Sequence, residues 1–125
     1  MELAVAAHQL AARLPPVHRF ELGTQIRKAA TSIPSNVAEG HAHGSDNVLM
    51  RHVRIALGSL AELETQVEIA VRLGLLKSDT TRNVMEQFVG TGQLLNGLKR
   101  ALEVQNRSRV LAVFVGAGTM ISTLA

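Results

Sequence analysis

The sequence contains no cysteine, no tryptophan and no tyrosine, and it has only three phenylalanines. Without cysteine, neither a disulfide nor a thiolate metal site can hold the fold together. The shortage of aromatic rings disfavours recognition of single-stranded nucleic acid by base stacking. Charged residues make up only 18% of the 125 residues, too few for a disordered chain, whereas hydrophobic residues make up 46%. We therefore expect one globular domain with its own hydrophobic core.

The charge balance is only mildly basic. Thirteen lysines and arginines stand against ten acidic residues, which gives a net charge of +3. Such an excess permits an anionic partner, such as RNA or DNA, without requiring one. The sequence opens Met1-Glu2 and lacks the basic segment that begins a secretory signal, so we predict a cytoplasmic protein.

Four segments carry apolar residues at the three- and four-residue steps of a helix. The sets are Leu3, Ala7, Leu10 and Leu14; Leu22, Ile26, Ala29, Ile33 and Val37; Leu49, Val53, Ala56, Leu60, Leu63, Val67 and Ala70; and Val84, Phe88, Thr91, Leu95, Leu98 and Leu102. Short connections between the later segments favour antiparallel neighbours. The sequence thus predicts an all-α fold, an antiparallel up-down four-helix bundle with helices at about 2–14, 20–40, 45–76 and 78–104.

Residues that end or begin helices lie between these segments. Pro15-Pro16 lacks the backbone N–H groups that would continue the first helix. We expect Gly40 to close the second helix in a left-handed conformation and Ser45 to cap the third. Ser78 is placed to cap the fourth helix.

The C-terminal part of the chain has a different composition. Residues 105–109 are polar and basic, and the sixteen residues 110–125 carry no charge. A helix needs about 20 apolar residues to span a bilayer, so we expect no membrane contact and regard a tail anchor as the less favoured alternative. We therefore divide the chain into a bundle, 1–104, and a tail, 105–125, that is disordered, loosely packed or laid against a neighbouring subunit.

Recognisable catalytic motifs are missing. The sequence has no phosphate-binding loop, no His-Glu-x-x-His zinc motif, no Glu-x-x-His pair and no nucleophile elbow. We predict no enzymatic activity and no cofactor. His41, His43 and His52 are the one group with possible metal-ligand spacing, but packed or solvated histidines explain them more simply, so no metal site is assigned.

Polar residues recur beside the apolar faces of the second and third segments. Helical spacing aligns Gln25, Ser32, Asn36 and Glu39, and it aligns Ser59, Glu62 and Gln66. Buried polar groups must find hydrogen-bond partners, so these lines are expected to meet each other or a second subunit. A structural network is the favoured interpretation, ahead of an active site.

Basic residues occur in close pairs, namely Arg27 with Lys28, Arg51 with Arg54, Lys99 with Arg100, and Arg107 with Arg109. Any one pair alone is typical of a solvated surface, but a ring of subunits would join such pairs into a continuous basic surface. Contact would then be made with phosphates, sensitive to salt and indifferent to base sequence. The candidate nucleic-acid-binding residues are Arg51, Arg54, Lys99, Arg100, Arg107 and Arg109.

The stretch TQIRKAATSIPSNVAEG, followed by IALGSLAELETQVEIAVRLGLL, resembles the four-helix-bundle protein family, also called the 23S rRNA intervening-sequence proteins. The resemblance is specific over about residues 20–76, moderate through the fourth helix and weak in the first. It implies a bacterial bundle that assembles as a homopentameric ring and has no established enzymatic activity. The accessory protein of diversity-generating retroelements is a similar pentameric bundle that binds nucleic acid and a reverse transcriptase.

The resemblance also implies which residues matter. The family's characteristic positions fall on Gln25, Arg27, Ala30, Ser32, Asn36, Glu39 and Gly40, and on Ala56, Gly58, Ser59, Glu62 and Glu64. The polar ones add Arg27 and Glu64 to the two lines described above, and together they are the candidate residues of a structural or interface network. His52 stands where an aromatic residue is common, and residues 41–44 replace a loop that is often basic.

Two functions remain open at this point. The first is a homo-oligomeric module that binds RNA or DNA backbone. The alternative is a protein-interaction scaffold without nucleic-acid contact. Pairing of Arg27, Arg51 and Arg54 with Glu39, Glu62 and Glu64 would leave little free basic surface and would favour the alternative.

Overall fold

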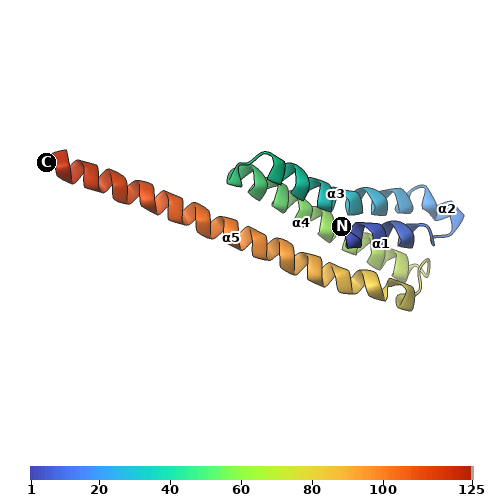
Figure 1. Cartoon of the computed structure of the whole chain (residues 1–125). Helices are drawn as coiled ribbons and strands as arrows, with labels where there is room; N and C mark the ends of the chain where they lie inside the picture. Colours follow the sequence, from blue (N-terminus) through green and yellow to red (C-terminus); the bar gives the residue numbers. More distant parts are fainter. Residues whose placement is uncertain (125) are drawn as a thin grey trace.

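The computed structural model describes the backbone of residues 1–124 and the side chains of residues 1–116. This part of the chain forms helices and contains no strand, so the predicted all-α class is confirmed. The helices are α1 (Glu2–Ala11), α2 (Pro16–Arg19), α3 (Leu22–Ala42), α4 (Asp46–Arg72) and α5 (Ser78–Leu124) (Figure 1).

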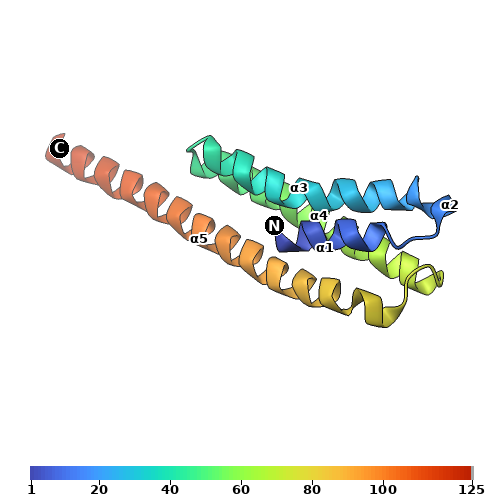
Figure 2. The ribbon, with the colours of Figure 1, turned by 45° about the vertical axis from the view of Figure 1, so that its right-hand side comes forward.

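The four longer helices alternate in direction along the chain. The most extensive contact joins α3 to α4, while α1 packs on α3 and α5, and α4 also packs on α5. The short α2 carries the chain from α1 to α3 at one end of the molecule (Figures 1 and 2). One core therefore lies between α1, α3, α4 and α5.

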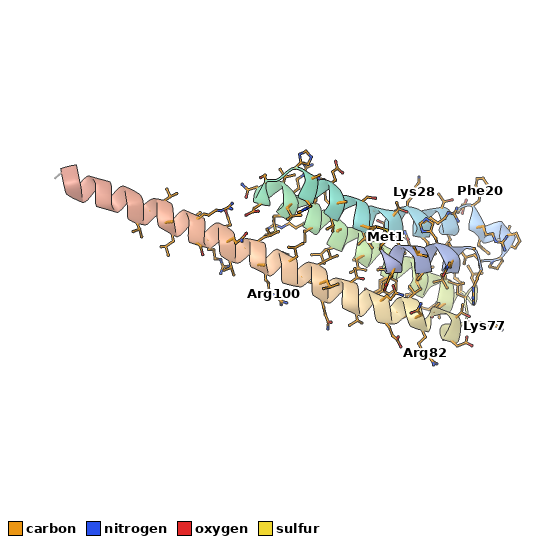
Figure 3. All side chains as sticks on the ribbon, viewed as in Figure 1. Met1, Phe20, Lys28, Lys77, Arg82 and Arg100 are labelled. Carbon is orange, nitrogen blue, oxygen red and sulfur yellow. The ribbon has the colours of Figure 1, made fainter. Side chains whose placement is uncertain are left out.

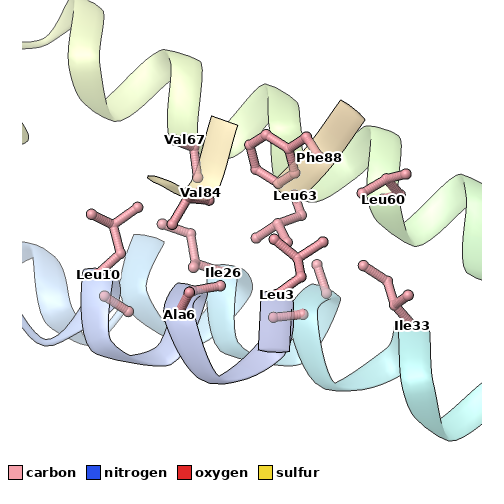
Figure 4. Packing of buried hydrophobic residues seen from close by; sticks show 14 of the residues in the cluster. Leu3, Ala6, Leu10, Ile26, Ile33, Leu60, Leu63, Val67, Val84 and Phe88 are labelled. Atoms are coloured by element: carbon pink, nitrogen blue, oxygen red, sulfur yellow. The ribbon is translucent and has the colours of Figure 1, made fainter. Parts of the chain in front are cut away.

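The apolar faces predicted from spacing are the faces that the helices bury. Leu14, Ile26 and Leu63 are fully enclosed, and α5 adds Val84 and Phe88 to the same cluster. Figure 4 shows side chains from all four helices converging there. Full burial of a large aliphatic side chain contributes about 1.5–3 kcal/mol, so this cluster is the main source of stability.

The first helix is shorter than the predicted 2–14. α1 ends at Ala11, and the chain continues in a turn in which Arg13 N–H donates to Leu10 O (3.0 Å) and Leu14 N–H to Ala11 O (3.2 Å). The residue before a proline is disfavoured in the helical region, so the helix does not continue through Leu14 to Pro15. Leu14 is nonetheless buried, because the turn directs it into the core.

The expected left-handed conformation at Gly40 was wrong. Gly40 lies inside α3, and Gly44 is the residue that takes a positive φ, of 73°. A Cβ on Gly40 would lie 2.7 Å from the Cβ of His52. Glycine is needed there because α3 and α4 approach closely, and not because the chain turns.

The other helix boundaries differ less from expectation. Ser45 occupies the N-cap of α4, as predicted, but its side chain makes no capping hydrogen bond. α4 ends at Arg72, earlier than the predicted 76, and Gly74 follows with a φ of 72°. α5 begins at Ser78, as expected, with Asp79 in its first turn.

The expected division near residue 104 does not appear in the secondary structure, because α5 continues without interruption to Leu124. No proline stands between residues 78 and 124 to end the helix. Leu102 is the last buried hydrophobic side chain among the described residues, and beyond the bundle α5 projects as a single helix (Figure 2). In the residues that the structure describes, no helix combines the length and apolar character needed to cross a bilayer.

Candidate functional site

A hollow of about 520 Å³ lies between the first turns of α4 and the middle turns of α5, around residues 102–109. We call it the arginine groove, since Arg51, Arg54 and Arg109 line it. Arg51 and Arg54 are three residues apart, so α4 presents them on one face. The remaining lining residues are Asp46, Asn47, Met50, Ile55, Leu102, Glu103 and Asn106.

Two of the three guanidinium groups in the arginine groove are free. Arg51 and Arg54 are exposed, and within the described part of the chain they make no ion pair and no side-chain hydrogen bond. Arg109 is engaged, since its Nη2 lies 3.0 Å from Asp46 Oδ2. The groove therefore offers two unpaired cationic groups, with Glu103 as the second acidic residue in its wall.

The other predicted basic residues lie elsewhere. Lys99, Arg100 and Arg107 do not line the arginine groove. Arg100 is exposed and projects from the side of α5 that faces away from the other helices (Figure 3). The structure thus brings together three of the six candidates, and it adds Asn47 and Asn106, which no sequence signal singled out.

The predicted polar lines meet between α3 and α4. Ser32 Oγ and Ser59 Oγ share a hydrogen bond of 2.8 Å across the two helices. Asn36 Nδ2 donates to Ser32 O (2.8 Å) and to Ser32 Oγ (2.9 Å), and His52 Nδ1 lies 2.9 Å from Asn36 Oδ1. These four half-buried residues form a continuous chain of hydrogen bonds, which includes His52 although the sequence did not assign it to the network.

Other members of the predicted network bond only within their own neighbourhood. Gln66 Nε2 donates to Glu62 Oε1 (3.1 Å) along α4, and the buried Oε1 of Gln66 has no partner in the described residues. Arg27 donates to Thr24 Oγ1 at 3.0 Å and to Arg19 O at 3.4 Å.

Gln25, Glu39 and Glu64 are exposed and have no side-chain hydrogen bond in the part of the chain described. Among the described residues, none of the anticipated pairs between Arg27, Arg51 or Arg54 and Glu39, Glu62 or Glu64 forms. The basic surface is therefore not consumed inside the bundle.

A group of metal-ligating side chains occurs where α3 ends against α4. The ligand atoms of Glu39, His43 and His52 all lie within 4.8 Å of one another. His41 is not part of the group. Residues two apart on a helix, such as His41 and His43, point in nearly opposite directions. Residues four apart, such as Glu39 and His43, share a face, so Glu39 and not His41 is the third member of the group.

Comparison with known proteins places these features in a family context. The family model described as 23S rRNA-intervening sequence protein matches residues 1–97. No curated protein matches the chain. The matched range includes Arg51 and Arg54 but ends before Lys99, Arg100, Arg107 and Arg109.

Proposed function

The chain belongs to the 23S rRNA-intervening sequence protein family, and from this we propose that it is a non-enzymatic homo-oligomeric bundle that binds the backbone of RNA or DNA. The observation that carries the proposal is the arginine groove, in which Arg51 and Arg54 are unpaired and exposed beside Arg109. A guanidinium group presents its N–H donors in a planar fork that fits two oxygens of one phosphate.

The proposed contact is with phosphates and not with bases. Among its lining residues the groove has no aromatic side chain on which a base could stack. Its lining also includes the apolar side chains of Met50, Ile55 and Leu102, against which the alkyl stem of an arginine can pack while its charged end stays in water. Binding of this kind depends strongly on salt and carries no direct sequence information.

Assembly as a ring, a homopentamer, is part of the same proposal. Several large apolar side chains of the single chain are exposed, including Phe20 (88%), Leu94 (77%) and Val89 (62%). Leu94 also lines, with Leu98, a mainly apolar hollow between α1, α3 and α5, and apolar surface gathered in this way is typical of a site of protein contact. A closed ring would repeat the arginine groove once per subunit. One RNA or DNA molecule would then contact the grooves of several subunits, although each groove carries only a modest charge.

Fluorescence anisotropy with labelled duplex DNA and RNA, at a series of salt concentrations, tests the proposal. The logarithm of the binding constant should fall linearly with the logarithm of the salt concentration. On duplex DNA the slope should be about −0.9 for each phosphate that the protein neutralises. Replacing Arg51 and Arg54 together by glutamine should weaken binding to all sequences alike and flatten the slope. Both side chains are exposed, so the helical circular dichroism signal should not change.

The matched control changes two basic residues outside the arginine groove. Lys77 and Arg82 are exposed near the start of α5 (Figure 3), and their replacement by glutamine removes the same charge. This control should leave affinity nearly unchanged. An equal loss in both double variants, or no complex at about 50 mM salt, would contradict the proposal.

Asp46 provides a test in the opposite direction. Its carboxylate pairs with Arg109, so Asp46→Asn should free a third guanidinium for phosphate. We expect tighter binding of nucleic acid. The slope of the logarithm of the binding constant against that of the salt concentration should become steeper by up to about 0.9, which corresponds to one more phosphate contact. If Asp46→Asn leaves both unchanged, Arg109 does not contribute to the contact.

One observation favours the alternative, a protein-interaction scaffold. A second hollow, of about 550 Å³, lies between α1, α3 and α5 and has a mainly apolar lining that includes Leu3, Ile33, Val37, Leu94 and Leu98. An apolar groove of this kind suits a helix of a protein partner. A wild-type protein that binds neither RNA nor DNA would favour this second function.

A further inference from the structure

We infer that Glu39, His43 and His52 form a binding site for Zn²⁺ at the end of the α3–α4 hairpin. The three residues come from two helices, and their ligand atoms all lie within 4.8 Å of one another. This site is separate from the arginine groove, with which it shares no residue.

The donor set has the chemistry that zinc prefers. Two imidazole nitrogens and one carboxylate oxygen form a three-residue set found in zinc proteins, in which water fills the fourth position. Tetrahedral zinc requires donors about 3.4 Å apart, given bonds of about 2.0–2.1 Å. Glu39 and His43 are exposed, so rotation of their side chains can close the remaining distance.

His52 has one ring nitrogen engaged by a neighbouring amide and the other available. Both donor contacts of the Asn36 amide go to Ser32, so its Oδ1 is the atom that faces His52 Nδ1 at 2.9 Å. Nδ1 must therefore carry the hydrogen, which leaves the lone pair on Nε2. A histidine ligand commonly donates its second ring N–H to an oxygen acceptor in this way, which fixes the ring and its tautomer.

The close approach of α3 and α4 at Gly40 brings the ligands together. Gly40 lies between Glu39 and His43, the residue that caps the C-terminus of α3, and the Cβ of His52 occupies the space that a side chain on Gly40 would need. The rings of His43 and His52 stand nearly parallel, with centroids 6.2 Å apart and planes inclined by 18°. Because an imidazole binds a metal in the plane of its ring, the exposed His43 ring must turn about its side-chain bonds to meet the ion.

The two exposed ligands are free to bind. The Glu39 carboxylate and the His43 ring make no hydrogen bond or ion pair within the residues described. Metal binding would therefore break no existing polar contact of these two side chains. It would join the last turn of α3 to α4 and so stabilise the hairpin.

Titration of the untagged 125-residue chain tests the site. Isothermal calorimetry with ZnCl₂ should give one ion per chain, and the midpoint of thermal unfolding should rise until one equivalent has been added. Co²⁺ used as a spectroscopic probe should develop visible d–d absorption that Zn²⁺ abolishes. His43→Ala and Glu39→Gln should each weaken binding at least tenfold, and both change exposed side chains, so they should keep the fold.

His41→Ala is the matched control, since His41 is exposed and lies on the same last turn of α3 outside the ligand group. This variant should bind Zn²⁺ as tightly as the wild type. No binding by the wild type, or the same loss in His41→Ala as in His43→Ala, would overturn the inference. His52→Ala should abolish the Co²⁺ spectrum, and circular dichroism of that variant reports whether the bundle persists.

Discussion

Gly40 sets the distance between α3 and α4 by having no side chain. A Cβ at this position would meet the Cβ of His52 at 2.7 Å and the Cα of Leu49 at 3.2 Å. Neither atom can move by a change of rotamer. Gly40→Ala should therefore force the helices apart and reduce the free energy of unfolding by about 1–3 kcal/mol, measured by urea denaturation.

Gly90 supplies the control for this prediction. It lies within α5, and a Cβ added there would meet nothing within 4 Å. Alanine is the better helix former, so Gly90→Ala should increase the free energy of unfolding by about 0.5–1 kcal/mol. If Gly40→Ala is also stabilising, the close approach of the two helices is not the reason for glycine at position 40.

At the scale of elements, α5 is one helix with two environments. Its first part supplies Val84, Phe88, Leu95 and Leu102 to the core, whereas its described side chains from residue 104 to 116 are all exposed. Deletion of residues 110–125 keeps Arg109 and should leave the midpoint of urea unfolding unchanged while lowering the helical circular dichroism signal.

A longer deletion is the comparison. Removing residues 100–125 also removes Leu102, which is 6% exposed, and should reduce the free energy of unfolding by about 1.5–3 kcal/mol. If the shorter deletion is as harmful as the longer one, the projecting part of α5 packs against a second copy of the chain.

At the scale of the whole molecule, the single chain leaves much apolar surface in water. If the proposed homopentamer covers this surface, sedimentation equilibrium at micromolar concentration should report five times the chain mass of 13.4 kDa. Leu94 is 77% exposed and lies in the apolar hollow, so Leu94→Lys should lower the mass without changing the helical content. A wild-type protein that sediments as a 13.4 kDa monomer would refute the assembly.

Much of the fold follows from the sequence alone. The spacing of residues such as Ile26, Leu63 and Phe88 predicted which helical faces are buried, because a period of 3.6 residues places side chains three and four apart on one side. The same local rule placed Arg51 beside Arg54 and aligned Ser32 with Asn36. These relations hold within one helix and need no knowledge of its neighbours.

The helix ends were less predictable. α1 stops at Ala11 and Gly40 lies within a helix, since turn geometry and the approach of a neighbouring helix decide these positions. The continuation of α5 past residue 104 likewise has no periodic apolar signal, because the described side chains there are exposed.

Only the tertiary structure decided which distant residues share a site. Arg109 reaches Asp46 and completes the arginine groove because α5 continues as a helix alongside α4. Glu39, and not His41, joins His43 and His52 because α3 presents residues four apart to the same face of α4. Local spacing determines which side of a helix a residue occupies, but the register between helices depends on core packing, which brings together residues that are far apart in the sequence.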